Sequence, residues 1–227
     1  MVSPIEKEAK KIVSGLQGII PTSVDGKEAI LQMKNEDSRN WRQMEWIGFW
    51  FEHLVAKKLS TQIAVSVGPT FGNTTIDLAL TYAWDLKVHP EGKPAKPMIL
   101  NDCEAVDACI DKHSGFGFVV VVGDATYDMT GQFKSWHDDL KGGRSAYEQV
   151  RIARGAPSRR RKVSFTPSRI EAVFLKDAEV VEKGLKDGWL GYFQQGMRNS
   201  NGTPRRAKYQ IRLSQAPDEV IVAGIDL

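Results

Sequence analysis

The 227-residue chain is predicted to fold as an α/β domain with a mixed central sheet flanked by helices. Three observations predict this class. Segments with helical spacing alternate along the chain with segments of strand character. Residues 116–122 (FGFVVVV) form a continuous apolar run that ends at Gly123, a pattern typical of a central strand buried on both faces. The apolar share of 41% and the charged share of 26% are ordinary for a folded domain with a sizeable core.

The first part of the chain is predicted to be helical. Residues 5–18 have the spacing of an amphipathic helix closed by glycine, and residues 27–34 favour a shorter helix. The strongest helical pattern covers residues 40–59, where apolar side chains recur at helical spacing. Either Ser38 or Asn40 is expected to cap this helix, which is unusually rich in aromatic residues.

Strands dominate the rest of the chain. The segments with strand character are residues 61–67, 75–80, 83–89, 116–122, 169–175, 208–213 and 219–225. The second and third of these are expected to form a hairpin joined across Thr81 and Tyr82. Further helices are predicted over residues 101–112, 131–141 and 145–154, and loops over the proline-containing segments 90–98 and 154–168.

Charge is distributed unevenly along the chain. The net charge is only +3, but the segment 141–169 holds nine Lys or Arg and a single acid, Glu148. A mildly acidic body with one strongly basic segment is typical of a protein that binds nucleic acid. Arg159, Arg160, Arg161 and Lys162 are the densest part of this segment, and a solvated loop is the alternative interpretation.

The composition also sets the expected environment. No apolar run approaches the roughly 18 residues of a membrane helix, so no membrane partner is expected. Two cysteines cannot form a disulfide framework, and an acid follows the amino terminus closely with no apolar signal region. A cytoplasmic location is therefore expected.

Three polar side chains interrupt the predicted hairpin. Side chains alternate between the two faces of a strand, so Asp85 and Lys87 share one face, while Leu86 and Val88 point to the other. Asp77 lies one strand earlier, across the hairpin, and is expected to converge with them. Two neighbouring carboxylates repel unless a cation joins them, and their oxygen atoms suit Mg²⁺. A lysine beside such a site favours metal-assisted hydrolysis of a phosphodiester.

The pattern of Asp77 followed by Asp85, Leu86 and Lys87 resembles the motif of the PD-(D/E)xK nuclease superfamily, and most closely that of type II restriction endonucleases. Ile76 stands where the name of the motif has proline, and seven residues separate the two aspartates. The resemblance implies a restriction-endonuclease-like core over residues 41–122. Additional strands and DNA-binding loops would lie within about 141–210 of a single domain, 1–227.

The resemblance also implies roles for these residues. Asp77, Asp85 and the backbone carbonyl of Leu86 would bind Mg²⁺, and Lys87 would position the attacking water. Members of the superfamily often carry a further glutamate on the preceding helix. Glu45 and Glu52 are the candidates, and Glu45 is preferred because it lies in the strongly apolar Met-Glu-Trp stretch, where a buried carboxylate needs a partner.

The DNA contacts are expected from two Arg-rich and Asn-rich regions, because arginine binds phosphate and guanine edges and asparagine binds adenine edges. The predicted DNA-binding residues are Arg144, Arg151, Arg154, Arg159, Arg160, Arg161, Lys162, Arg198, Asn199, Asn201, Arg205 and Arg206. The expected activity is Mg²⁺-dependent, sequence-specific cleavage of double-stranded DNA by a homodimer, as the resemblance implies. Two alternatives stay open: a structure-selective repair or junction nuclease, and a DNA-binding protein in which Asp85 and Lys87 are merely paired.

Overall fold

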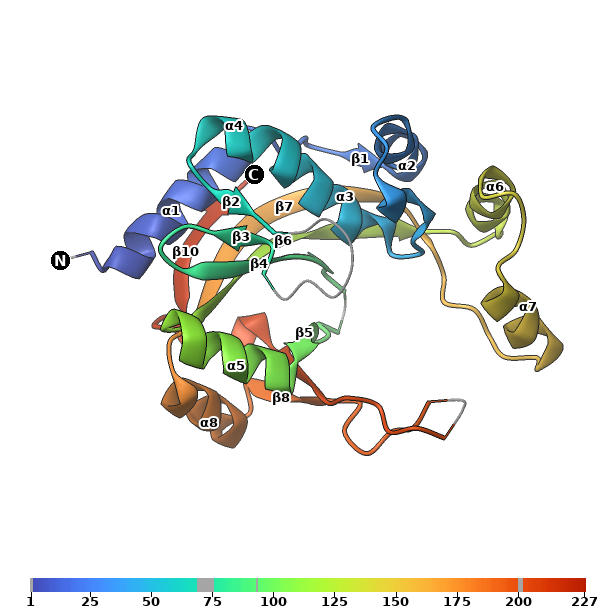
Figure 1. Cartoon of the computed structure of the whole chain (residues 1–227). Coiled ribbons are helices and arrows are strands. Elements are labelled where there is room, and N and C mark those ends of the chain that lie inside the picture. Colours follow the sequence, from blue (N-terminus) through green and yellow to red (C-terminus); the bar gives the residue numbers. More distant parts are fainter. Residues whose placement is uncertain (1, 69–75, 93, 200–201) are drawn as a thin grey trace.

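The computed structural model describes residues 2–68, 76–92, 94–199 and 202–227 and has a mixed α/β architecture (Figure 1). The helices are α1 (Pro4–Gln17), α2 (Gly26–Asn35), α3 (Trp46–Leu54), α4 (Ser60–Gln62), α5 (Cys103–His113), α6 (Gln132–Leu140), α7 (Ala146–Ala153) and α8 (Ala178–Asp187). The strands are β1 (Val24–Asp25), β2 (Ser66–Val67), β3 (Leu78–Ala79), β4 (Ala83–Pro90), β5 (Met98–Asp102), β6 (Phe116–Tyr127), β7 (Lys162–Leu175), β8 (Leu190–Phe193), β9 (Lys208–Ile211) and β10 (Ile221–Asp226). The predicted α/β class with a helix-flanked mixed sheet is therefore confirmed.

A curled mixed sheet organises the part of the chain that the structure describes. Its strand order is β1-β7-β6-β4-β3-β2, and β10 also pairs with β7. Strands β4 and β6 are parallel and are connected through α5, as a crossover between parallel strands requires. The other pairs in this sheet are antiparallel, including the β3–β4 hairpin. A smaller antiparallel sheet has the order β5-β9-β8.

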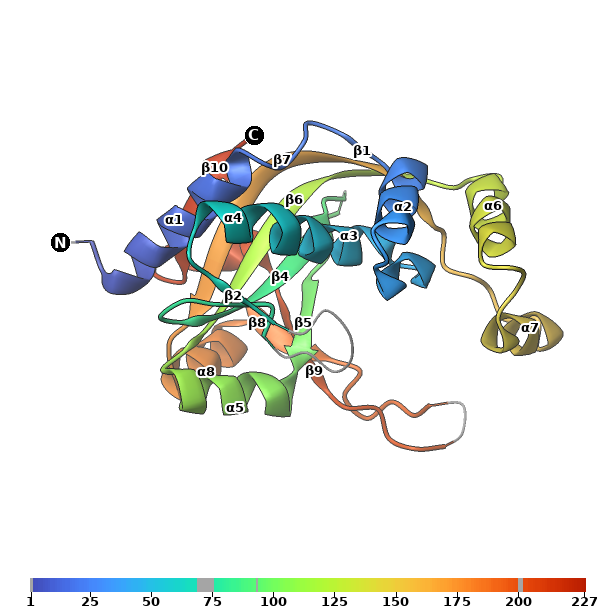
Figure 2. The same ribbon diagram turned by 45° about the horizontal axis from the view of Figure 1, so that its top comes forward.

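The large sheet is covered on both faces (Figure 2). Helices α1, α2 and α3 pack on one face, and α5, α8 and the small sheet pack on the other. Residues 116–122 are buried throughout, which confirms the prediction of a central strand. Gly117 lets the Trp84 ring lie against the sheet, because a Cβ there would fall 2.0 Å from that ring.

The predicted helix over residues 40–59 is wrong as one element. Arg39–Arg42 form a 3-10 turn, and Ser38 precedes it without a side-chain capping hydrogen bond. Gln43 is extended, so α3 starts only at Trp46. A π-helical turn over Val55–Leu59 then interrupts the α-helical pattern. An apolar spacing of three to four residues does not reveal these breaks, because all the pieces bury apolar side chains.

Three strand boundaries also differ from the prediction. Of the strand predicted over 75–80, only Leu78–Ala79 is a strand among the described residues 76–80. Only Ser66–Val67 of the predicted strand 61–67 forms a strand, and the segment begins in a helix because Ser60–Gln62 are helical. The predicted loop 154–168 is partly strand, since β7 begins at Lys162. Pro167 is tolerated there because it lies where the register between β6 and β7 shifts.

The remaining elements divide into confirmed and missed ones. The helices predicted over 5–18, 27–34, 101–112, 131–141 and 145–154 are confirmed within a few residues, as is the hairpin pairing of β3 with β4. The strand predicted over 169–175 is the second half of β7, and the strands predicted over 208–213 and 219–225 correspond to β9 and β10. The prediction missed β1, β5, α8 and β8.

A projection extends from one end of the large sheet. Strands β6 and β7 run beyond the core and carry α6 and α7 (Figures 1 and 2). We call this projection, residues 128–161, the arm. Within the described residues, none of the helices has the length and apolar character needed to cross a membrane.

Candidate active site

The turn of the β3–β4 hairpin is held by a glutamate from the first helix. The carboxylate of Glu8 on α1 accepts hydrogen bonds from the backbone N–H groups of Thr81 and Tyr82, at 2.9 and 3.0 Å. It also accepts one from the indole N–H of Trp84 at 2.8 Å. Glu8 is buried, and these three N–H donors satisfy the hydrogen-bonding capacity of its carboxylate oxygens. The hairpin is thereby fixed against the helical face of the sheet.

Asp77 lies directly before β3, where the hairpin strands begin to separate. Its backbone N–H still donates to the Trp84 carbonyl oxygen at 3.0 Å. Its carboxylate Oδ2 accepts the backbone N–H of Leu86 at 2.8 Å, so a side chain replaces a strand partner there. The prediction that Asp77 approaches the Asp85–Lys87 segment across the hairpin agrees with this contact.

Asp85 and Lys87 form a buried pair on β4. Asp85 is only 3% exposed, and its Oδ2 contacts the Lys87 ammonium. Asn101 on β5 bridges the pair: its Nδ2 donates to Asp85 Oδ1, and its Oδ1 accepts from Lys87 Nζ, both at 2.8 Å. The alternation that put Asp85 and Lys87 on one strand face is confirmed. The pair is not an exposed surface salt bridge, because both side chains are largely enclosed.

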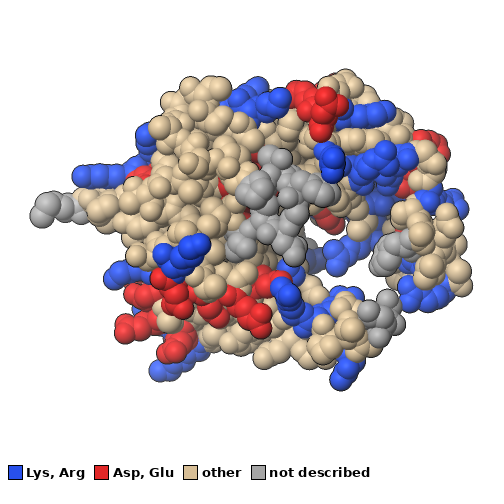
Figure 3. All heavy atoms as spheres, in the orientation of Figure 1, with Lys and Arg blue, Asp and Glu red and all other residues tan. Residues whose placement is uncertain are grey.

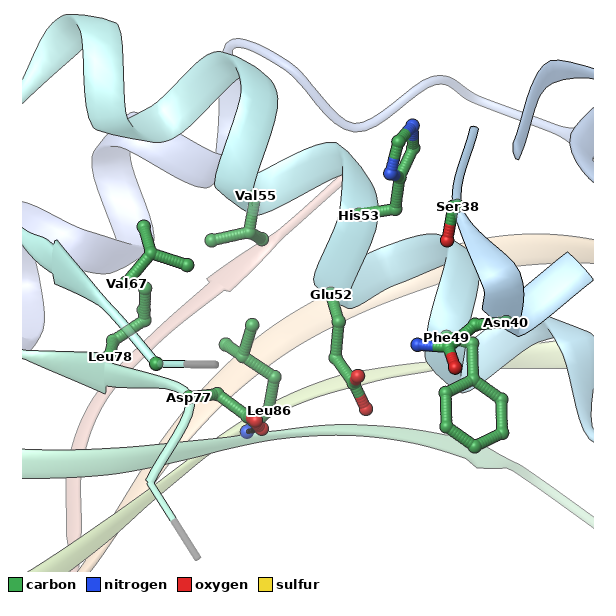
Figure 4. A pocket seen from close by; sticks show the side chains of 11 residues that line it. Ser38, Asn40, Phe49, Glu52, His53, Val55, Val67, Asp77, Leu78 and Leu86 are labelled. Atoms are coloured by element: carbon green, nitrogen blue, oxygen red, sulfur yellow. Dashed lines mark hydrogen bonds between the residues drawn. The ribbon is translucent and has the colours of Figure 1, made fainter. Parts of the chain in front are cut away.

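Glu52 is the helix glutamate beside the two aspartates. It extends from α3 towards the level of Asp77 and Leu86 (Figure 4). These three residues line a narrow cavity of about 20 Å³ together with Phe49. A cavity of that size has room for about one water-sized sphere. A small space enclosed by two carboxylates is suited to a water molecule or a cation.

The carboxyl groups of this site perturb one another. Burial, together with the charges of Asp77 and Asp85, raises the pKa of Glu52 to about 8. Burial and the charge of Asp85 raise the pKa of Asp77 to about 6, although the Leu86 N–H and the Lys87 charge oppose this. Acids with such raised pKa values gather at sites that bind or transfer charge. Without a bound cation, Glu52 therefore keeps its proton at neutral pH.

The prediction that Glu45, and not Glu52, lies beside the aspartates is wrong. Glu45 precedes α3, its side chain is 46% exposed, and its Oε2 lies 2.5 Å from Lys162 Nζ. Trp46 is buried and its indole N–H donates to the Lys162 carbonyl oxygen, which directs this end of α3 towards β7. The apolar neighbours of Glu45 in the sequence are thus buried without it.

The raised pKa values predict an unusual pH dependence of stability. The pKa of Glu52 is higher in the folded chain than the ordinary 4.5, so the folded state binds more protons than the unfolded state. Without divalent cations, the free energy of unfolding should fall as pH rises from about 4.5 towards about 8. Glu52→Gln should flatten this fall, measured by urea unfolding with EDTA at pH 5.5 and pH 8.

Glu45→Gln is the matched control for that measurement, because Glu45 lies at the N-cap position of the same helix α3 and has a partly exposed side chain. It should leave the pH dependence as in the natural chain. An equal slope in the natural chain and in Glu52→Gln would show that Glu52 is not the group that loses its proton.

The oxygen atoms of this site are of the type that binds a hard divalent cation, although the carboxylates do not surround a common point. In residues 2–68, 76–92, 94–199 and 202–227, no three acidic, histidine or cysteine side chains form a ready metal-binding group. Asp85 Oδ2, however, is a buried oxygen that contacts the Lys87 ammonium but accepts no regular hydrogen bond among the described residues. Carboxylate oxygens and the Leu86 carbonyl are the ligand type that Mg²⁺ prefers. The residues present thus fit Mg²⁺.

The predicted DNA-binding residues divide into two groups. Exposed side chains on the arm and on the β8–β9 connection (residues 194–199 and 202–207) are Arg144, Arg154, Arg159, Arg160, Arg198, Asn199, Arg205 and Arg206. Asn201 lies outside the described residues. Basic side chains line the opening between the body and the arm, whereas acidic ones gather over the region of α5 (Figure 3).

The other group is buried or paired within the protein, which corrects the prediction for three residues. Arg151 binds both carboxylate oxygens of Glu148, at 2.7 and 2.8 Å. Arg161 is only 7% exposed and lies near acidic side chains of α6 and α7, including Glu148. Lys162 is paired with Glu45. Arg151 stabilises the arm, and Lys162 stabilises its junction with α3. Arg161 is buried, so none of the three belongs to an open phosphate-binding surface.

A hollow of about 490 Å³ lies where the arm meets the end of β4. Its lining includes Arg159 and Arg160 from the arm, Lys96 from the β4–β5 connection, and Tyr127 at the end of β6. Pro90, three residues beyond Lys87 on β4, also lines it. The hollow therefore adjoins the strand that carries the buried Asp85–Lys87 pair. The sequence offered no signal for Lys96 or Tyr127.

Comparison of the chain with protein-family models, with curated proteins and with solved structures finds no match in any of the three. The interpretation of the site therefore depends on its own geometry and chemistry.

Proposed function

We propose that the protein is a Mg²⁺-dependent endonuclease that hydrolyses phosphodiester bonds of double-stranded DNA, in the manner of a type II restriction enzyme. The observation that carries this proposal is that Glu52 and Asp77 line one small cavity next to Leu86, the residue between the buried Asp85 and Lys87. Each of these residues comes from the β3–β4 hairpin or from the helix that packs on it. Carboxylates and a lysine in this arrangement provide what phosphodiester hydrolysis needs.

The residues have distinct roles in this proposal. Asp77, Asp85 and the Leu86 carbonyl would hold Mg²⁺, with Glu52 as a further ligand or as a base for a bound water. A bound Mg²⁺ supplies Lewis-acid polarisation of the phosphate and lowers the pKa of water. Lys87 carries three N–H donors, of which Asp85 and Asn101 engage two. Its third donor would bind the attacking water or a phosphate oxygen.

The topology supports a restriction-endonuclease-like core. From α3 onward the described chain runs α3, β2, β3, β4, β5, α5 and β6, apart from the π-helical turn and the short α4. Strand β5 pairs in the small sheet, so the elements of the large sheet and its helices follow the order helix, hairpin strands, helix and central strand. This is the order expected from the resemblance of the motif. We propose that the arm and the small sheet are additions to that core, and that two copies act together on a palindromic site.

The exposed cations indicate a polyanionic substrate that lies along the hollow. Arg159, Arg160 and Lys96 border the hollow, and the exposed arginines of the β8–β9 connection belong to the second basic region. In the proposed complex, the phosphate backbone of the duplex binds along Arg159, Arg160 and Lys96. It then passes Pro90 to reach the carboxylates of the candidate site. Arg198 and Asn199 are then placed on the loop proposed to read base edges.

Digestion of a phage genome with Mg²⁺ tests the proposal directly. Discrete fragments with uniform ends are expected, and none should form in excess EDTA or with Ca²⁺ alone. Cleavage of branched DNA but not of linear duplex would instead identify a junction nuclease. Binding of duplex without cleavage under any divalent cation would leave the non-catalytic alternative.

The path of the duplex predicts a specific change in salt dependence. Arg159→Ala combined with Arg160→Ala removes two exposed charges from the hollow. If both arginines bind phosphates, the slope of log affinity against log salt should become shallower by about two. Fluorescence anisotropy in Ca²⁺ measures this slope for cognate and random duplexes.

Lys183→Ala combined with Lys186→Ala is the matched control, because these exposed lysines lie on α8. The control pair should leave the slope as it is. An unchanged slope in the Arg159 and Arg160 variant would exclude the hollow from the DNA path. Arg161 is not part of the test because it is buried.

A further inference from the structure

Asn101 is the neutral residue between two opposite charges of the site. Its amide nitrogen donates to Asp85 Oδ1 and its amide oxygen accepts from Lys87 Nζ, each at 2.8 Å. Both contacts cross from the small sheet to the large one, since Asn101 is on β5 and the pair is on β4. One amide group therefore fixes the carboxylate and the ammonium at the same time.

The backbone of β5 is irregular at this position. Strand β5 pairs Ile99 with Gln210 and Asp102 with Lys208, so the register shifts between these pairs and one extra residue is accommodated on β5. A bulge redirects side chains and is common beside active sites. Here the irregular segment contains Leu100, which is buried in the core, and Asn101, which contacts the Asp85–Lys87 pair.

We infer that Asn101 is a positioning residue of the proposed nuclease, which keeps the Lys87 ammonium in place when the Asp85 oxygens turn to a divalent cation. This inference rests on the proposed function. In the present arrangement Asp85 Oδ2 contacts Lys87, so the cation and the lysine compete for the same oxygen. Asn101 offers Lys87 a second acceptor that remains after that contact is given up.

The chemistry of an amide suits this role. The Lys87 side chain is only 22% exposed, so an ammonium that left Asp85 without another acceptor would lose a hydrogen bond that water replaces poorly. The oxygen of Asn101 is neutral, so it holds the ammonium without adding a fourth carboxylate that would draw the cation away. Its nitrogen at the same time orients Asp85, as residues around metal ligands commonly do.

Two substitutions of similar size separate this role from simple structural support. Asn101→Leu removes both hydrogen bonds and should lower kcat for duplex cleavage with Mg²⁺ by about 10- to 100-fold, with KM for DNA little changed. It should also weaken Ca²⁺ binding, measured by calorimetry, because Lys87 then competes harder for Asp85. Asn101→Asp should lower kcat as well, since it ties Lys87 in a new ion pair, but it should tighten Ca²⁺ binding.

Gln210→Leu is the control, since Gln210 is on the neighbouring strand β9 and its amide nitrogen lies 3.4 Å from the Tyr192 carbonyl oxygen. It should change neither kcat nor Ca²⁺ binding. Opposite effects of the two Asn101 variants on Ca²⁺ binding, with kcat lowered in both, would support the inference. Near-natural kcat in both variants, or equal loss of Ca²⁺ binding and thermal stability in both, would overturn it. A natural chain that neither cleaves DNA nor binds Ca²⁺ would instead refute the proposed function, and the inference would fall with it.

Discussion

Lys87→Ala should lower the rate of duplex cleavage by about 10²- to 10⁴-fold, the range for loss of a positioned proton-transfer group. The Lys87 side chain contacts both Asp85 and Asn101, and Lys87 is the one lysine in the sequence of β4. Asp85→Asn should have at least as large an effect, because it removes the buried charge that the cation would bind. Single-turnover cleavage with Mg²⁺ measures both variants.

Binding of cognate duplex in Ca²⁺ should remain in both variants, because neither residue belongs to the exposed basic surfaces. Lys183→Ala is the matched control, since Lys183 on α8 forms an exposed pair with Glu219. Near-natural cleavage by folded Lys87→Ala protein would remove the lysine from the site. Thermal unfolding of each variant separates lost chemistry from lost structure.

Glu52→Gln should lower cleavage far more than Glu45→Gln, by about 10- to 100-fold in the first and hardly at all in the second. Glu52 shares the small cavity with Asp77, whereas Glu45 is exposed and paired with Lys162. The loss should be greatest at low Mg²⁺ concentration if Glu52 is a ligand. A rate measured across Mg²⁺ concentrations distinguishes a ligand, which excess metal rescues in part, from a base, which it does not.

The reverse ranking of the two glutamates would contradict the geometry of α3. It would mean that the exposed carboxylate at the start of the helix, and not the enclosed one, takes part in the chemistry. Both substitutions keep the shape of the side chain, and urea unfolding at the assay pH separates the stability change expected for Glu52→Gln from an effect on the chemistry.

Strand alternation carried the most reliable part of the sequence prediction. The two-residue period puts Asp85 and Lys87 on one face whatever the neighbouring elements do, and the structure has them in contact. The approach of Asp77 followed from a short hairpin connection and is also observed, through the N–H of Leu86. Such local constraints survive folding because they involve few intervening residues.

The choice of helix glutamate could not be made in this way. It depended on where the helix begins, and that point is set by tertiary contacts such as the hydrogen bond from Trp46 to the Lys162 carbonyl. Apolar neighbours in sequence indicate that a segment is buried, but they do not say which side chain of the segment faces inward. Glu52 was the second candidate from the sequence, and the packing of α3 on the hairpin is what distinguishes it from Glu45.

Charge counting was similarly limited. The single acid of the basic segment, Glu148, accepts hydrogen bonds from Arg151 and forms an ion pair with Lys134 on α6. Part of the positive charge that suggested DNA binding therefore stabilises the arm itself. Asn101 was missed because β5 follows a proline-containing segment and was not predicted as a strand, so nothing in the sequence placed it opposite Asp85.

The contact of Glu8 with the hairpin turn has a consequence for how activity is lost on heating or in denaturant. Glu8 lies more than seventy positions before its partners at Thr81, Tyr82 and Trp84, so this contact forms only when distant parts of the chain come together. Helix α1 also packs against β7 and β10, which joins the hairpin to the opposite edge of the sheet. Non-local contacts of this kind couple local opening to global unfolding. The site and the whole fold should thus melt together, in one cooperative transition.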